Sequence, residues 1–87
     1  MKIYKYEIEV TDQQTLQLPQ QAEILSIQVQ DNNIMLWALV IDYTKLVDYR
    51  FIECYGTGHE IVDDANELVF LATIQYRGGV WHFFERK

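Results

Sequence analysis

Hydrophobic and polar residues alternate along most of this chain with the period of two that is typical of β-strands. In the first ten residues, Tyr4, Tyr6 and Ile8 share one parity, whereas the other parity is mainly charged. Successive side chains of an extended segment point to opposite faces, so this pattern predicts a half-buried strand. A shorter strand is predicted over 15–18, and it ends at Pro19. Because proline cannot donate a hydrogen bond to a ladder, we expect an edge strand there.

Two hairpins are predicted where turn-forming residues separate hydrophobic runs. Residues 23–30 alternate, an Asp-Asn-Asn turn follows, and the return arm 34–42 is hydrophobic at nearly every position. Aspartate and asparagine tolerate positive φ, which favours a tight turn. An arm that is hydrophobic on both parities predicts a central strand covered on both faces; a short buried helix is the alternative, which its β-branched residues disfavour. The second hairpin joins 68–76 to 80–85 through Arg-Gly-Gly.

The remaining segments complete an all-β pattern. Residues 49–55 alternate again, and the Asp- and Asn-rich stretch 62–67 indicates a loop or a single helical turn. A helical period does not extend over ten residues anywhere in the sequence. We therefore predict one all-β domain over residues 1–87, folded as a small antiparallel barrel or a two-sheet sandwich of six to seven strands with little or no helix.

The charge of the chain argues against several classes of partner. Thirteen acidic residues oppose seven basic ones, and the net charge of −6 disfavours binding to nucleic acid or to an anionic membrane. Seven of the acidic residues lie within 42–67, against two basic ones. This segment is interpreted as a solvated acidic loop. The alternative is that it imitates the phosphate pattern of DNA and occupies the basic cleft of a host protein. No run reaches the roughly 18 apolar residues of a membrane span, and the lone Cys54 favours a reducing cytoplasm.

The segment 56–59 reads Gly-Thr-Gly-His and is the most distinctive short motif of the chain. Two glycines around a hydroxyl allow backbone N–H groups to converge on an anion, and the histidine adds a charge that changes near neutral pH. Acidic residues at positions 60, 63 and 64 would repel a phosphate group. A turn whose glycines satisfy backbone geometry is therefore the simpler interpretation.

Residue types that serve in catalysis or metal binding do not combine into a known arrangement. Ser26, the only serine, lies mid-strand without an elbow glycine, and Cys54 shares the parity of Ile52, which predicts a place in the core. Asp63 and Asp64 are adjacent, so their carboxylates would point apart in an extended chain. The Cys, His and Asp residues do not match a zinc spacing. We therefore expect no enzymatic activity, no metal and no cofactor.

The C-terminal run 80–84 is hydrophobic on both parities around His82. At least one of its faces needs cover that a small domain lacks, which predicts that a homodimer contact or a partner protein buries this hairpin. Together with the glycine-rich loop and its acidic neighbours, this run supplies the candidate binding residues. They are Gly56, Thr57, Gly58, His59, Asp63, Asp64, Trp81, His82 and Phe84.

The order of five segments along the chain gives a further indication. These segments are Ile3-Tyr4-Lys5-Tyr6, Leu18-Pro19 with 22–29, Leu36-Trp37-Ala38-Leu39, Gly56-Thr57-Gly58-His59 and Trp81-His82-Phe83-Phe84. Together they resemble a family of short proteins that are encoded by bacteriophages and prophages and catalogued as a domain of unknown function. The resemblance covers nearly the whole chain. It implies a phage origin, action in the cytoplasm of an infected bacterium, and no assigned reaction.

These observations predict a small interaction protein that binds and inhibits a host protein, in particular a host defence protein. Two alternatives stay open: a structural or assembly component of the virion, and an oligomer that sequesters a small ligand with the 56–59 loop. A host protein is the expected partner, and a homo-oligomer is a further prediction. Neither nucleic acid nor a membrane is expected to bind directly.

Overall fold

Seven antiparallel strands and one short 3₁₀ helix form the computed structural model of the chain, which describes residues 1–41, 45–62 and 64–87. In chain order they are β1 (Lys2–Ile8), β2 (Gln13–Pro19), β3 (Glu23–Gln30), β4 (Asn33–Val40), β5 (Val47–Gly56), η1 (Ala65–Glu67), β6 (Leu68–Tyr76) and β7 (Gly79–Arg86). The prediction of six to seven strands with little helix is confirmed. The single helical turn expected within 62–67 is η1.

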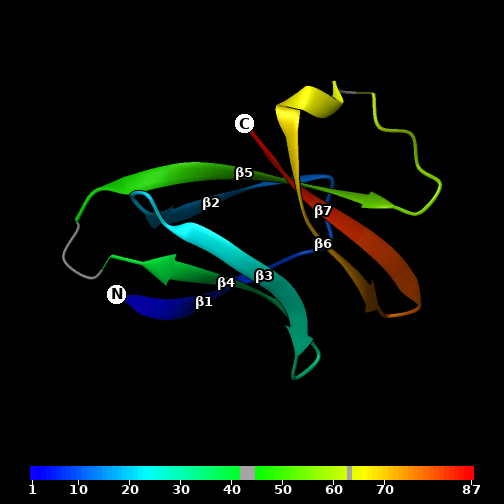
Figure 1. Cartoon of the computed structure of the whole chain (residues 1–87). Coiled ribbons are helices and arrows are strands. Elements are labelled where there is room, and N and C mark those ends of the chain that lie inside the picture. Colours follow the sequence, from blue (N-terminus) through cyan, green and yellow to red (C-terminus); the bar gives the residue numbers. More distant parts are fainter. Residues whose placement is uncertain (42–44, 63) are drawn as a thin grey trace.

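The strands form two antiparallel sheets that pack against each other (Figure 1). The strand order is β1-β4-β3 in the three-stranded sheet and β2-β5-β7-β6 in the four-stranded sheet. The edge strands β3 and β6, which belong to different sheets, lie side by side. The described residues therefore form a two-sheet sandwich and not a closed barrel, which decides between the two predicted architectures.

The core lies between the sheets and is built from the inward parity of each strand. The four alternate residues of β4 from Ile34 to Val40 are all buried. The buried hydrophobic residues are Ile8, Leu18, Ala22, Ile27, Ile34, Leu36, Ala38, Val40, Ile52, Cys54, Ile74 and Phe83. Because removing apolar surface from water is the main driving force of folding, strands with one apolar parity are stable as two facing layers.

Both predicted hairpins are confirmed, and their turns require positive φ. Asp31 and Asn32 have φ values of 51° and 64°, which is the backbone of a two-residue type I′ turn between β3 and β4. Arg77 and Gly78 have φ values of 49° and 82° between β6 and β7. These turns match the right-handed twist of the flanking strands, so each one sets the register of its hairpin.

β4 is the central strand of its sheet, as predicted, but the other sheet covers only one of its faces. Met35 and Leu39 on the outer face are half-buried. Trp37 lies between them, with the ammonium group of Lys5 at 5.7 Å from its ring centre. A sandwich has no third layer, so the expectation of cover on both faces is wrong for the described part of the chain.

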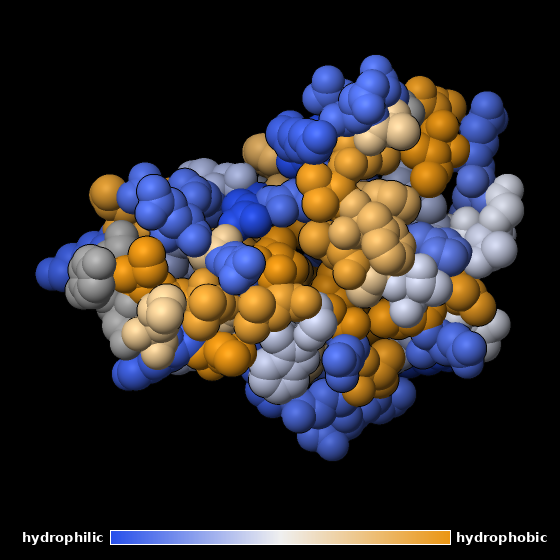
Figure 2. Space-filling view, viewed as in Figure 1, coloured by the Kyte–Doolittle hydropathy of each residue, from blue (hydrophilic) through white to orange (hydrophobic). Residues whose placement is uncertain are grey.

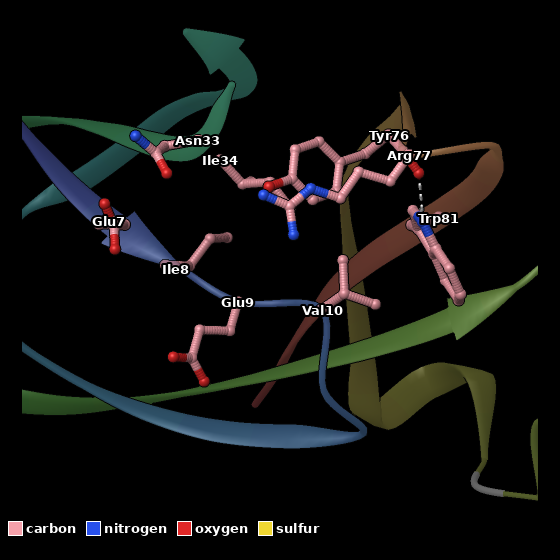
Figure 3. A pocket seen from close by; sticks show the side chains of 9 residues that line it. All are labelled: Glu7, Ile8, Glu9, Val10, Asn33, Ile34, Tyr76, Arg77 and Trp81. Carbon is pink, nitrogen blue, oxygen red and sulfur yellow. Dashed lines mark hydrogen bonds between the residues drawn. The ribbon is translucent and has the colours of Figure 1, made fainter. Parts of the chain in front are cut away.

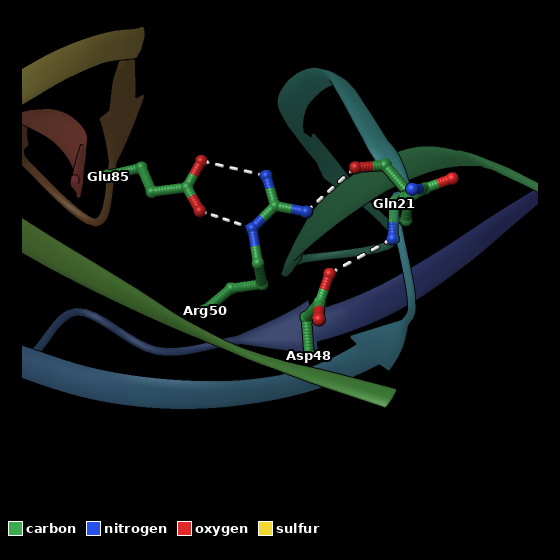
Figure 4. A network of polar contacts seen from close by, with 5 residues as sticks. Gln21, Asp48, Arg50 and Glu85 are labelled. Atoms are coloured by element: carbon green, nitrogen blue, oxygen red, sulfur yellow. Dashed lines mark hydrogen bonds and ion pairs between the residues drawn. The ribbon is translucent and has the colours of Figure 1, made fainter. Parts of the chain in front are cut away.

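A polar cluster fastens the corner between β2 and β3 to the four-stranded sheet (Figure 4). Arg50 donates from Nη2 to Glu85 Oε1 (2.9 Å) and from Nη1 to the carbonyl oxygen of Ala22 (2.7 Å), and its Nε also contacts Glu85. Asp48 accepts from the backbone N–H of Gln21 (3.0 Å). The hydrogen bond to Glu85 raises the pKa of Arg50 above its ordinary value. Because this corner joins the two sheets, the cluster positions one sheet on the other.

Candidate binding face of the four-stranded sheet

The outer face of the four-stranded sheet carries a row of aromatic residues from β5. Alternation along this strand places Tyr49, Phe51 and Tyr55 on the outer face, and it places Ile52 and Cys54 in the core. Tyr49 is 63% exposed and Phe51 is 50% exposed, although large aromatic side chains gain free energy from burial. On β5, therefore, Ile52 and Cys54 face the core and the aromatic residues lie on the outer face.

Phe84 of β7 lies between two other aromatic rings of this face. Its ring makes edge contacts with Tyr55 (centroids 6.0 Å apart, interplanar angle 71°) and with Phe70 of β6 (5.5 Å, 69°). Such pairs contribute about 0.5–1.5 kcal/mol beyond the burial of area. Phe70 nevertheless stays 56% exposed. We define the aromatic face as Tyr49, Phe51, Tyr55, Phe70 and Phe84.

A buried ion pair lies within the same face. Glu53 is only 2% exposed although it has the outward parity of β5, and its cross-strand neighbours are Gln13 and Phe84. Arg86 donates from Nε to Glu53 Oε2 (2.6 Å), and the Tyr55 hydroxyl donates to Oε1. A buried carboxylate is costly unless its charge and both oxygens are satisfied, and here each oxygen has a donor. The pair therefore holds Arg86 and Tyr55 in fixed positions under the aromatic face.

Two hollows adjoin this ion pair, and both are lined by Phe51 and Arg86. One has a volume of about 410 Å³ and includes Glu53 in its wall. The other has a volume of about 420 Å³ and includes Tyr49 and Val69. The aromatic face is thus an uneven surface with concave places beside exposed rings, which is a shape that can receive side chains of another molecule.

Hydrophobic side chains also gather where the sheet edges β3 and β6 meet. Figure 2 shows a band of hydrophobic side chains across the middle of the molecule. The exposed hydrophobic residues of these two strands are Leu25, Val29, Val69 and Phe70. Phe70 also belongs to the aromatic face, so the apolar surface extends from that face to the neighbouring edge.

The predicted site residue His82 lies on the same outer face between two hydroxyl groups. Its Nε2 is 2.7 Å from Thr57 Oγ1, and its Nδ1 is 2.8 Å from Thr73 Oγ1. A neutral imidazole has one donor and one acceptor, and a hydroxyl can serve either role, so both nitrogens are satisfied. His82 thus joins β7 to β6 and to the end of β5 on this face.

The predicted Gly-Thr-Gly-His loop forms a tight turn that is stabilised by its own groups. The His59 N–H donates to the Gly56 carbonyl (3.0 Å), and the Gly56 N–H donates to His59 Nδ1 (3.3 Å). The Thr57 N–H donates to the Val80 carbonyl (3.3 Å). Gly58 has a φ of 88°, which favours glycine. Three of the four N–H groups of this loop already donate within the protein, which favours a turn over an anion site.

Trp81 points to the opposite side of β7 from His82 and Phe84. Its Nε1 donates to the Tyr76 carbonyl (3.2 Å), and its ring lines a hollow of about 420 Å³ at one end of the sandwich (Figure 3). The other lining residues are Glu7, Ile8, Glu9, Val10, Asn33, Ile34, Tyr76 and Arg77. The Arg77 guanidinium lies 4.9 Å from the Tyr76 ring centre. Because two carboxylates and one guanidinium line this hollow, its net negative charge disfavours anions.

Asp64, another predicted site residue, caps the 3₁₀ helix η1. Its Oδ1 accepts from the backbone N–H of Asn66 (2.9 Å), and its carbonyl oxygen accepts from the N–H of Glu67 (2.9 Å). Aspartate commonly satisfies helix-terminal N–H groups in this way. Asp63 lies outside the described residues, as does Asp42 at the start of the acidic segment.

Cys54 is buried, and burial raises its pKa to about 11. It is therefore a protonated thiol at neutral pH and a poor nucleophile. In the part of the chain that the structure describes, no group of three or more His, Cys, Asp or Glu residues is arranged to hold a metal ion. No described helix is both long and apolar enough to cross a membrane.

The structure brings only some of the predicted site residues together. Thr57 contacts His82 through the hydroxyl, and a side chain at Gly56 would lie 3.3 Å from the Trp81 ring. Phe84 has the parity of His82 and lies on the same face. Trp81 thus lies on the other face of β7 from His82 and Phe84, Asp64 lies at η1, and the binding role of the predicted site residues stays a prediction.

Reasoning from the sequence missed the ion pair at the centre of the aromatic face. The sequence contained one signal for this ion pair: Glu53 is an acidic residue that shares the parity of the aromatic residues Phe51 and Tyr55 on β5. Its partner Arg86 lies 33 residues away, and no local pattern connects the two. Only the pairing of β5 with β7 brings them together.

The fold and this face define the chain as a small antiparallel β-sandwich with an exposed aromatic sheet surface. The family model of a domain of unknown function, DUF7352, matches residues 1–87, and the chain belongs to this family. The resemblance to a domain of unknown function is thereby confirmed. No curated protein and no solved structure matches the chain.

Proposed function

We propose that the protein is a protein-binding module and that the aromatic face is its contact surface. The observation that carries this proposal is the exposure of Tyr49, Phe51 and Phe70 on one face of one sheet, at 63%, 50% and 56%. Aromatic residues are enriched in protein interfaces, where a few of them contribute most of the binding free energy. A partner that covers this face would recover the burial that these rings lack in the isolated chain.

The rigidity of the face supports the same proposal. Phe84 is held between Tyr55 and Phe70, and the Glu53–Arg86 pair fixes the side chains beneath them. Side chains that are already ordered lose less conformational entropy when a partner binds. Among the exposed rings, Phe70 then contributes its contact area at low entropic cost.

Charge supports a protein partner over a nucleic acid. The net charge is −6, and the guanidinium of Arg86 is engaged by Glu53 within the face. Surfaces that stack single-stranded nucleic acid combine aromatic rings with free cationic groups that follow the phosphates. An acidic chain with aromatic rings suits an apolar or basic protein surface better.

Within this proposal, the leading partner is a host protein that is bound and inhibited during phage infection, with a host defence protein as the expected target. Its support is the resemblance of five ordered segments to phage- and prophage-encoded proteins. A structural or assembly role in the virion is the alternative, and it would use the same face. Sequestration of a small ligand by the 56–59 loop has less support, because the loop's N–H groups are largely used internally.

Affinity purification from an infected bacterium tests the proposed function. The tagged wild-type chain is compared with Phe51→Ser/Phe70→Ser and with the control Leu46→Ser/Val62→Ser, which removes exposed apolar side chains outside the aromatic face and the β3–β6 edge. A protein retained by the wild type is then purified and titrated against all three chains. We expect binding about 30-fold weaker or more for the face variant, and nearly unchanged binding for the control.

Equal binding of the purified target to all three chains would contradict a role of the aromatic face. The alternatives give other results. Co-purification with assembled particles would support the virion role. Stabilisation by nucleotides that is lost in His59→Ala would support ligand sequestration.

A further inference from the structure

β1 is an edge strand, and the β3–β4 turn determines which of its backbone groups point outward. β1 is the last strand in the order β1-β4-β3. Gln30 and Asn33 flank a two-residue turn and therefore form a hydrogen-bonded pair. Hydrogen-bonded pairs alternate along an antiparallel ladder, so odd-numbered residues of β4 bond to β3 and even-numbered ones bond to β1. The even-numbered residues of β1 are the partners of the even-numbered residues of β4.

The N–H and C=O groups of Ile3, Lys5 and Glu7 consequently point away from β4. The next odd-numbered residue, Glu9, confirms this orientation independently. Its N–H donates to Gln14 Oε1 (3.1 Å), and its C=O accepts from Gln14 Nε2 (2.8 Å). One side-chain amide thus satisfies the edge at Glu9 as a neighbouring strand would. No described strand pairs with the edge from Ile3 to Glu7.

The other three edge strands are less available for pairing. β3 and β6 lie side by side where the two sheets meet. β2 ends at Pro19, which has no N–H group to offer to a further strand. Natural sheets protect their edges by such means, and β1 is the edge on which the described residues show the least protection.

The charges of β1 are ordered so that the strand complements a second copy of itself. Lys2 and Lys5 lie in its first half, whereas Glu7 and Glu9 lie at its end and just beyond. An antiparallel copy brings the basic half of one strand opposite the acidic half of the other, and a parallel copy would oppose like charges. Antiparallel pairing of identical strands also has the two-fold symmetry of most homodimers.

We propose that β1 pairs with β1 of a second copy across a two-fold axis and forms a homodimer with one continuous six-stranded sheet. With Tyr6 on the axis, Lys5 lies opposite Glu7 of the second copy, and this ion pair occurs twice. Hydrogen-bonded pairs then fall on Lys5 and Glu7, whose N–H and C=O groups point to the open edge, whereas the groups of Glu9 already bond to Gln14. On the core side, Tyr4 lies opposite Ile8 of the second copy, which covers a ring that is 44% exposed in one chain.

The charges also distinguish this register from its neighbours. A register with Lys5 on the axis opposes two lysines, and one with Glu7 on the axis opposes two glutamates. The dimer involves the three-stranded sheet, whereas the aromatic face belongs to the four-stranded sheet. The two proposals are therefore independent, and either can fail without the other.

Sedimentation equilibrium of the purified chain tests the dimer, with an expected mass of twice 10.4 kDa. Lys5→Glu and Glu7→Lys each convert both ion pairs into like-charge pairs, and each should weaken the dimer about 30-fold. Lys5→Glu/Glu7→Lys should restore it, and a mixture of the two single variants should form a heterodimer. Lys45→Glu and Glu60→Lys make the same changes at exposed positions outside β1 and should have no effect.

A second measurement reads the register directly. Tyr6→Cys should form a disulfide between copies, because residues on the axis of a non-hydrogen-bonded pair have Cα atoms about 4.5 Å apart. Thermal unfolding of each variant shows that it is folded. A wild-type chain that stays monomeric up to about 1 mM overturns the proposal. A dimer that both single charge changes leave intact also overturns it, as does a disulfide from Lys5→Cys in place of Tyr6→Cys.

Discussion

Removing the guanidinium of Arg86 tests whether the aromatic face rests on a buried charge pair. Arg86→Met keeps an unbranched side chain on β7 but leaves the Glu53 carboxylate with the Tyr55 hydroxyl and without its cation. Glu53 is 2% exposed, so water cannot fully hydrate its charge in place. An uncompensated buried charge is strongly destabilising, and the variant should therefore unfold at lower denaturant concentration.

The expected loss in the free energy of unfolding is about 2–3 kcal/mol. Breaking a fully buried pair costs about 3–5 kcal/mol. The Arg86 side chain is 32% exposed, so water can enter the space that it leaves, and this reduces the cost. For a domain of this size the loss corresponds to a fall in Tm of roughly 10–20 °C. Glu53→Met/Arg86→Met removes both charges and should lie within about 1 kcal/mol of the wild type.

Urea unfolding followed by tryptophan fluorescence measures these differences. Arg77→Met is the matched control. The exposed guanidinium of Arg77 lies against the Tyr76 ring at the β6–β7 turn, and removing such an exposed contact costs less than about 1 kcal/mol. The decisive comparison is between the single and the double variant. Equal destabilisation of the two would refute the reasoning, because the loss would then come from packing and not from an unpaired charge.

Two further predictions concern the core thiol and the C-terminal turn. Cys54 should not react with a thiol reagent near pH 8 in the folded chain but should react in urea, because burial raises its pKa to about 11. Since this pKa lies above the ordinary 9.0, the free energy of unfolding should fall as pH rises from about 9 to about 11; rapid labelling of the native protein would contradict both expectations. In calorimetry, Gly79→Ala should lower Tm more than Gly78→Ala. A methyl group at Gly79 would lie 2.6 Å from the Trp81 ring, whereas at Gly78 it meets open space and only the positive φ opposes it, at about 1–2 kcal/mol; the reverse order would contradict the close approach of Trp81.

Strands and turns were predictable because local properties of the chain determine them. The alternation of β1 and β5 arises from the pleat of an extended backbone, in which neighbouring side chains point to opposite faces. The turns at Asp31 and Asn32 and at Arg77 and Gly78 need positive φ, which these residue types supply, with arginine as the exception. Alternation likewise placed Cys54 in the core, as the structure confirms.

The order of the strands could not be predicted in this way. β1 pairs with β4 and β2 pairs with β5, so the first two strands lie in different sheets although they are consecutive. Such pairings depend on how all strands together bury the most apolar surface. The same competition decided between sandwich and barrel, since both satisfy an alternating pattern equally well.

The candidate site shows the same division. The sequence by itself determined that His82 and Phe84 share one face of a strand and that Trp81 lies on the other, because a strand has a period of two. Tertiary structure alone decided that the aromatic parity of β5 faces solvent and that Glu53 meets Arg86 beneath it. Which parity is buried depends on the strands packed against it, and that choice is made by the whole fold.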